Sequence, residues 1–556
     1  MKLRVLALIG CCASSALQAE PAPPGYACAT AHPLATQACM EVMAEGGNAF
    51  DAAVAASAAI AVVEPTGSGL GGGGFWLLHR AADDLEVFID GRETAPGRAH
   101  RNMYLDAQGK AIDAASRDGV LSAAIPGEPA ALDHIAARYG SKPLAQLLAP
   151  AIRHARDGFP VDAKLAQAIV RSQKRLSGAA PAVFMPQGQP LAEGALLRQP
   201  DLARTLEQIA EQGRDGFYQG AVARRLLDAV SANRGLWSAE DLRHYAVIER
   251  EPLETRFRDY RIVSAPPPSA GGVALAQVFQ QLEALGWVDD GSAQAQHLLI
   301  ETLRRAYRDR AAFLGDPDFV SIPLQRLSGR SHAIGLAASI RREQATRSAE
   351  LPPAPALQEG NNTTHISVLD AAGNRVAATL SINLGFGSGY MAPGTGVLLN
   401  DEMDDFSAAP GVSNAYGLIG SEPNAVAAHK RPLSSMTPSF VEGPRGLLVI
   451  GTPGGSRIIT MVLQGILGWM AGLDAAQTVA LPRLHHQYLP DIVQLEPGYA
   501  DSGRQAQLKA LGQQLQVSDS TWGNMQLISW NPKAGTLQAA ADPRGVGLGS
   551  VWLETP

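Results

Sequence analysis

The feature that most constrains this chain is a proline-rich connector in mid-sequence that delivers a strand beginning Thr363-Thr364-His365. The connector, residues 347–362, has the composition of an exposed linker. Before it, residues 25–355 show mainly helical periodicity with short strands between. After it, strand patterns take over at 365–370 and 375–383. The sequence therefore predicts a mixed α+β protein whose two parts meet at an exposed joint.

Composition excludes several classes of protein. With 46 Lys+Arg and 53 Asp+Glu the net charge is −7, so nothing indicates a nucleic-acid partner. No stretch after the N-terminus reaches the ~18 apolar residues of a membrane span. Residues 1–19 predict a signal peptide, with basic residues, an apolar run and Leu17-Gln18-Ala19 as cleavage site. We expect a periplasmic or secreted protein, a lipoprotein anchored at Cys11 being the alternative.

Two cysteines, Cys28 and Cys39, remain outside the predicted signal peptide. The sequence favours two small buried side chains in a strand and a helix. A single disulfide, which an oxidising compartment permits, is the alternative.

Common catalytic signatures are missing from the sequence. There is no phosphate-binding P-loop, HExxH, GxSxG or CxxC motif, and the adjacent His485-His486 would point in opposite directions. We therefore expect neither a metal nor a cofactor.

What remains is a set of loops rich in Gly, Ser, Asn, Arg and acidic residues. Taken singly, each has an ordinary structural interpretation as a tight turn, a solvated loop or a surface ion pair. The loops are Asp90–Glu93, Asn361–His365, Ser381–Asn383, Leu399–Phe406, Lys430–Met436 and Thr452–Arg457.

Together the loops resemble the gamma-glutamyltransferase (glutathione hydrolase) family of N-terminal-nucleophile hydrolases. Further blocks that look like the family's run from Gly46-Gly47-Asn48 through Pro266-Pro267-Pro268 to Asp542-Pro543-Arg544. The resemblance implies a four-layer αββα sandwich without cofactors. It also implies a large subunit, residues 20–362, and a small subunit, residues 363–556, that form one core as a heterodimer.

The resemblance also implies a chemistry. The precursor would cut itself between Asn362 and Thr363, and the freed α-amine, with a pKa near 7.7–8.0, would act as the base for the Thr363 hydroxyl. The enzyme would take glutathione and other γ-glutamyl compounds and pass the γ-glutamyl group to water or to acceptor amino acids or dipeptides.

Site roles follow from the matching positions. Gly454 and Gly455 would supply N–H donors to the oxyanion, and Thr364 and Ser381 would orient Thr363. The substrate head would be bound at its α-carboxylate by Arg92, Ser434 and Ser435 and at its α-ammonium by Asn383, Glu402 and Asp405. Tyr416 would lie in a lid over the pocket. Ser381 and Glu402 stand where other members carry Thr and Gln.

Two alternatives remain open from the sequence. A cephalosporin or glutaryl acylase of the same superfamily would share Thr363 but bind a side chain without an α-amine. A non-catalytic, anion-binding scaffold would never be cleaved.

Overall fold

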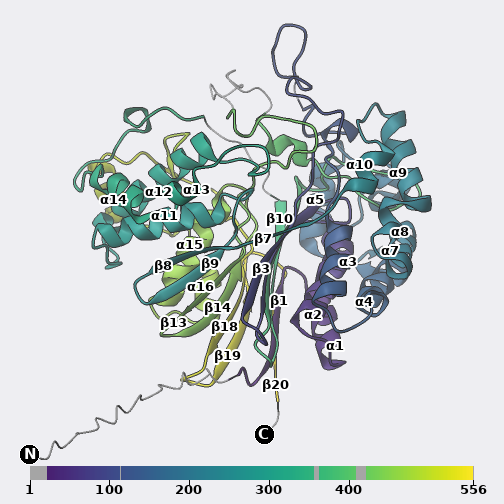
Figure 1. Ribbon diagram of the computed structural model, residues 1–556, viewed down its shortest axis with the longest axis horizontal. Helices are drawn as coiled ribbons and strands as arrows, with labels where there is room; N and C mark the ends of the chain where they lie inside the picture. Colours follow the sequence, from purple (N-terminus) through teal and green to yellow (C-terminus); the bar gives the residue numbers. More distant parts are fainter. Residues whose placement is uncertain (1–21, 113, 356–361, 408–420, 555–556) are drawn as a thin grey trace, which may run out of the picture.

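The computed structural model describes residues 22–112, 114–355, 362–407 and 421–554. The predicted signal peptide, residues 356–361 of the connector and Tyr416 lie outside these residues. Two stacked sheets form the centre, and a layer of helices covers the outer face of each, which gives four layers (Figure 1).

The first sheet has seven strands drawn from both predicted subunits. In spatial order they are β20 (Leu548–Leu553), β1 (Gly25–Thr30), β10 (Asn362–Leu369), β11 (Arg375–Asn383), β2 (Gly73–Arg80), β3 (Leu85–Gly91) and β7 (Ile248–Arg250). All neighbours are antiparallel. Because β10 pairs with β1 on one side and β11 on the other, the strand that follows the predicted cleavage point is central.

The second sheet has six antiparallel strands. They are β19 (Thr536–Ala541), β18 (Gln526–Asn531), β14 (Gly446–Gly451), β13 (Ser439–Gly443), β9 (Tyr260–Ser264) and β8 (Leu253–Phe257).

Helices form the two outer layers (Figure 1). The first sheet is covered by α1 (Pro33–Ala44), α2 (Ala49–Val63), α3 (Glu128–Arg138) and α4 (Leu144–Asp157), with α5 (Ala163–Ser172), α7 (Pro200–Gln212), α8 (Asp215–Tyr218), α9 (Gly220–Ala232) and α10 (Ala239–His244) further out. The second is covered by α11 (Gly271–Ala284), α12 (Ala293–Phe313), α13 (Leu324–Leu327), α14 (Arg330–Ala338), α15 (Arg457–Met470) and α16 (Ala475–Ala480).

Alternation along the first sheet divides the core in two. In β2, Trp76 and Leu78 pack with the helices of the first layer, whereas Phe75 and Leu77 pack against the second sheet. Successive side chains of a strand point to opposite faces, so a strand buried on both faces is apolar throughout. The same parity in β10 decides where its threonines point.

The cysteine prediction was wrong in its preferred form. Cys28 in β1 and Cys39 in α1 form a disulfide, with their Cα atoms 6.5 Å apart. Helix α1 follows β1 directly and packs on the sheet face to which Cys28 points, which brings the two side chains together. The sequence alone did not fix that packing.

We expect the two polypeptides of the cleaved protein to elute together on gel filtration without denaturant. The small chain would supply β20, β10 and β11 to a sheet in which β1 and β2 belong to the large chain, so separation would break three ladders in this sheet and the β13–β9 ladder in the second. Denaturing electrophoresis of the same peak should show both chains. Two separate peaks without denaturant would contradict a shared core.

Candidate active site

Thr363 is the second residue of the central strand β10, and its side chain faces the space between the two sheets. It shares this face with Ser367, whose hydroxyl donates to the main-chain oxygen of Gln526 in the second sheet at 3.2 Å. Thr363 is 8% exposed. Strand parity therefore aims the predicted nucleophile at the loops that follow the strands of the second sheet.

The bond predicted to be cleaved lies at an irregular point of the ladder. Thr363 is paired with Ser381 of β11, and the register shifts between Asn362 and Thr363. The Ser381 hydroxyl lies 3.4 Å from the carbonyl oxygen of Asn362 and accepts from the N–H of Asn383 at 2.9 Å. Ser381 is thus placed at the carbonyl group that the Thr363 hydroxyl would attack.

Gly454 and Gly455 form the turn between β14 and α15. Their φ angles are +141° and +57°, which residues with a Cβ rarely adopt. A Cβ at Gly454 would lie 2.5 Å from the Met461 methyl carbon. Because α15 begins just after them, at Arg457, this turn is suited to negative charge.

One small pocket, the substrate pocket, gathers most of the predicted residues. It is lined by Arg92, Thr363, Ser381, Asn383, Asp405, Ser434, Ser435, Met436, Gly455 and Ile458. These residues come from six separate stretches of sequence. Glu402 is not part of this lining but contacts Arg92. Gly454 directly precedes the lining residue Gly455 in the sequence.

Arg92 is the centre of a buried charge cluster. It is 1% exposed; its Nη2 donates to Asp405 Oδ2, its Nη1 lies 2.8 Å from Glu402 Oε2, and Glu93 Oε2 is 3.5 Å away. The resemblance predicts Arg92 and Asp405 at opposite ends of the substrate head, whereas in the structure the two side chains contact one another. One guanidinium faces three carboxyl groups, so full ionisation would leave the cluster at 1 − 3 = −2.

Burial determines the protonation of this cluster. It raises the pKa of Glu402 to about 7, against the opposing effect of Arg92, and raises the pKa of Glu93 well above its usual value. The surrounding carboxylates outweigh burial at Arg92 and raise its pKa, so the guanidinium stays charged. Burial thus draws the charge of the cluster from −2 toward neutrality, and an ammonium group entering it would favour ionisation of the acids again.

Thr364 lies on the opposite face of β10 from Thr363. Its hydroxyl donates to Glu64 Oε2 at 2.7 Å, and burial raises the pKa of that carboxyl group. Thr364 can therefore position Thr363 only through the main chain. Glu64 follows an alanine-rich helix in the sequence, where nothing marks it as part of the site.

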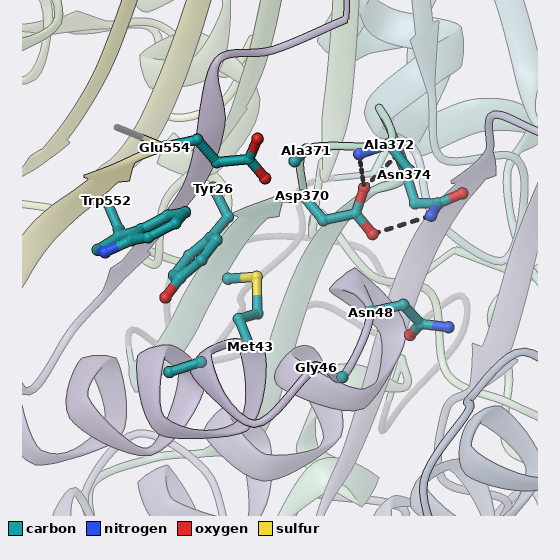
Figure 2. Close-up of a pocket in the computed structure, with 12 residues that line it drawn as sticks. Tyr26, Met43, Gly46, Asn48, Asp370, Ala371, Ala372, Asn374, Trp552 and Glu554 are labelled. Carbon is teal, nitrogen blue, oxygen red and sulfur yellow. Dashed lines mark hydrogen bonds between the residues drawn. The ribbon is translucent and has the colours of Figure 1, made fainter. Parts of the chain in front are cut away.

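A larger hollow lies at the far end of β10, about 20 Å from Thr363 at the usual rise per residue. Figure 2 shows Tyr26 and Trp552 on one side of it and Asp370 and Asn48 on the other. The Asp370 carboxylate is already engaged by the Ala49 N–H at 2.9 Å and by the Asn374 amide at 2.8 Å. This hollow offers no nucleophile and is separate from the candidate site.

A four-layer sandwich with a threonine between its sheets, opposite a glycine turn, defines the class of N-terminal-nucleophile hydrolases. The gamma-glutamyltranspeptidase family model matches residues 35–552. The glutathione hydrolase proenzyme of Escherichia coli strain K12 is 40% identical over 569 residues, covering 98% of this chain and 97% of the relative. The chain belongs to the gamma-glutamyltranspeptidase family.

Acylases are also among the similar proteins. The acylase ACY 1 proenzyme of Pseudomonas sp. strain V22 is 38% identical over 533 residues, covering 93% of this chain and 92% of the relative. The crystal structure of a cephalosporin acylase from Bacillus halodurans superposes with a TM-score of 0.85 at 27% identity, covering 96% and 97% of the two chains. The comparisons thus confirm the fold. Whether the substrate is a γ-glutamyl compound or an acylase substrate depends on the residues that line the pocket.

The buried Glu402 carboxyl group gives a prediction about pH. Because its folded pKa is raised to about 7, its stabilising protonation is complete below pH 4.5 and is lost as the pH rises through 7. The isosteric Glu402→Gln variant escapes this loss. Its stability relative to the parent should therefore improve by about 1–3 kcal/mol between pH 5 and pH 8.

Thermal unfolding midpoints at the two pH values measure this difference. Glu254→Gln, at a side chain 44% exposed, is the matched control and should show no such trend. An equal effect of Glu402→Gln at both pH values would mean that Glu402 is ionised throughout.

Proposed function

We propose that this protein is a self-processing γ-glutamyltransferase and glutathione hydrolase. It cleaves the γ-glutamyl amide of glutathione and related compounds through a γ-glutamyl-Thr363 ester. The observation that carries the proposal is that Thr363, Arg92 and Asp405 line the same pocket. A nucleophile and a binding site for a charged amino-acid head are thereby adjacent.

Processing begins with the Thr363 hydroxyl attacking the carbonyl carbon of Asn362. The peptide C–N bond breaks, the acyl group passes to the Thr363 oxygen, and the nitrogen takes up the hydroxyl proton. Water then hydrolyses the ester, which frees the Asn362 carboxylate and the Thr363 α-amine. Ser381, at 3.4 Å from the Asn362 oxygen, is placed to polarise that carbonyl group.

The freed α-amine then serves as the base for its own hydroxyl, because its pKa of about 7.7–8.0 lies near the working pH. The hydroxyl attacks the γ-carbonyl carbon, and the turn at Gly454 and Gly455 stabilises the oxyanion, where one donor is worth about 2.7–4 kcal/mol. The leaving amine departs with a proton from the α-ammonium. Water or an acceptor amino acid or dipeptide then takes the acyl group.

Recognition of the γ-glutamyl head uses the charge cluster. We assign the α-carboxylate to Arg92, Ser434 and Ser435, because a guanidinium fork matches a carboxylate. The α-ammonium falls to Asn383, Glu402 and Asp405. A surplus of carboxyl groups around Arg92 supports this choice over a glutaryl or cephalosporin acylase, whose substrate side chain lacks the α-amine.

We further propose that the protein is exported to the periplasm or secreted. The pattern of residues 1–19 and the Cys28–Cys39 disulfide support this, since disulfides persist in oxidising compartments. Among the described residues, no helix has the length and apolar character needed to cross a membrane.

Thr363→Ala should remain a single chain near full length and release no p-nitroaniline from γ-glutamyl-p-nitroanilide, since one hydroxyl performs both reactions. Thr363→Ser should retain part of each activity. Denaturing electrophoresis and the p-nitroaniline assay, with and without glycylglycine, measure them. If Thr363→Ala is still cleaved and active, another residue must be the nucleophile. If the unmodified protein is cleaved but does not turn over the substrate, the proposed activity is refuted.

Asp405→Asn should be processed normally but lose about 10- to 100-fold in kcat/KM for γ-glutamyl-p-nitroanilide. Self-cleavage uses no bound glutamate, whereas a hydrogen bond between charged groups is worth about 1.5–3 kcal/mol. Turnover of glutaryl-p-nitroanilide, which lacks the ammonium group, should fall much less.

Asp404→Asn is the matched control, because Asp404 accepts from Ser116 at 2.5 Å and does not line the pocket. It should leave the ratio of the two substrates as in the parent. Equal fractional losses for both substrates in Asp405→Asn would remove the recognition role from Asp405.

A further inference from the structure

Glu64 is an acidic residue close to the nucleophile strand that neither the family resemblance nor the proposed mechanism uses. It directly follows helix α2, in which every residue from Ala49 to Val63 is buried. Its N–H donates to the Ile60 carbonyl oxygen at 2.9 Å, and its own carbonyl oxygen accepts from the Gly67 N–H at 2.9 Å. The Glu64 side chain is therefore carried by a rigid support.

The Glu64 carboxyl group contacts the start of β10. The Thr364 hydroxyl donates to Glu64 Oε2 at 2.7 Å. A Cβ at Gly67 would lie 3.0 Å from Glu64 Oε2 and 3.3 Å from the main-chain oxygen of Thr363, so these two oxygens approach the same point of the loop after α2. Glu64 is thus close to the main chain of the predicted nucleophile.

The start of β10 is the part of the strand with the least support from the sheet. The ladder with β1 joins residues 366–369, and among the described strands residues 363–365 pair with β11 alone. Strand β11 belongs to the same predicted small chain, and the His365 ring binds hydroxyl groups of that chain. In the described structure, the hydrogen bond from Thr364 to Glu64 therefore joins this segment to the predicted large chain.

The proposed cleavage removes a covalent support of Thr363. In the uncut chain Thr363 lies between Asn362 and Thr364, and Asn362 is itself paired with Asn383. After the cut Thr363 is a chain terminus, and terminal residues open at little cost in free energy unless they are tied down. A displacement of about 1 Å can cost about 100-fold in rate. The hydrogen bond one residue away then becomes important for keeping the hydroxyl and the α-amine in place.

We infer that Glu64 is a positioning residue that holds the new N-terminus of the small chain through Thr364. This inference rests on the proposed function and concerns the same site. Self-cleavage takes place while Asn362 still holds Thr363, whereas every later turnover depends on the hydrogen bond to Glu64. Loss of that bond should therefore lower turnover more than self-cleavage.

The first test measures kcat and KM for γ-glutamyl-p-nitroanilide in cleaved Glu64→Ala and Thr364→Val proteins. We expect kcat to fall about tenfold in each, the contribution of one such hydrogen bond, with KM as in the parent. Because both residues act through one bond, the combined variant should lose no more than the larger single loss. Glu64→Gln and Thr364→Ser, which keep the acceptor and the hydroxyl, should retain most of the activity. Self-cleavage, followed by denaturing electrophoresis, should slow much less than turnover.

Thr205→Val is the matched control for the loss of a buried hydroxyl group. Thr205 is 2% exposed and donates to the Thr395 carbonyl oxygen at 2.7 Å, likewise between the two predicted chains but not to β10. It should match the parent in kcat. An unchanged kcat in Glu64→Ala, additive losses in the combined variant, or an equal loss in Thr205→Val would overturn the inference. If Glu64→Ala fails to fold, Thr364→Val, which keeps the shape of the side chain, tests the same contact.

The second test needs no substrate, and so it separates this inference from the proposed activity. Hydrogen exchange of peptides covering residues 363–369 is measured by mass spectrometry in the cleaved protein and in the uncut Thr363→Ala protein. Glu64→Ala should speed exchange at the start of β10 about tenfold in the cleaved protein and much less in the uncut one. Equal exchange with and without the carboxyl group would overturn the inference. The expected acceleration in a cleaved protein that releases no p-nitroaniline would support the inference and refute the proposed activity.

Discussion

The antiparallel ladder around β10 is the constraint on which the rest of the structure depends. The strand is fixed on both sides, by β1 and by β11, and so the face to which each of its side chains points is fixed as well. Thr363 faces the second sheet and its glycine turn; Thr364 faces α2 and Glu64. A shift of one residue would exchange these two environments and remove the hydroxyl from the pocket.

The charge cluster around Arg92 depends on a second constraint, the burial of ionisable groups. Three carboxyl groups around one guanidinium are a poor solution for stability alone, because burial opposes their ionisation. The arrangement becomes reasonable for a site that must accept a zwitterion, since the guanidinium then gains a carboxylate and the acids gain an ammonium group. Under the proposed function, stability would be given up locally for selectivity.

The sequence predicted many of the elements because their signals are local, whereas the four-layer arrangement came from the family resemblance. Helical periodicity indicated the helix-rich region before the connector, and alternation after it placed β11 at its observed bounds. The family resemblance supplied the distant loops that line the substrate pocket. The Cys28–Cys39 bond and the Thr364–Glu64 contact depend on how elements pack, which no local pattern contains. The signal peptide and the lid with Tyr416 lie outside the described residues.

The order of strands in the first sheet affects how the protein can assemble and refold. Segments before and after residue 362 alternate across it: β20 and β10 flank β1, while β2 borders β11. An uncut chain reaches this arrangement by a first-order process, since one covalent tether brings every strand to its neighbours. Once the tether is cut, two chains must find each other and interleave, so refolding becomes second order and falls with dilution. Under the proposed cleavage, assembly would therefore be a step that the molecule completes once, before its chemistry begins.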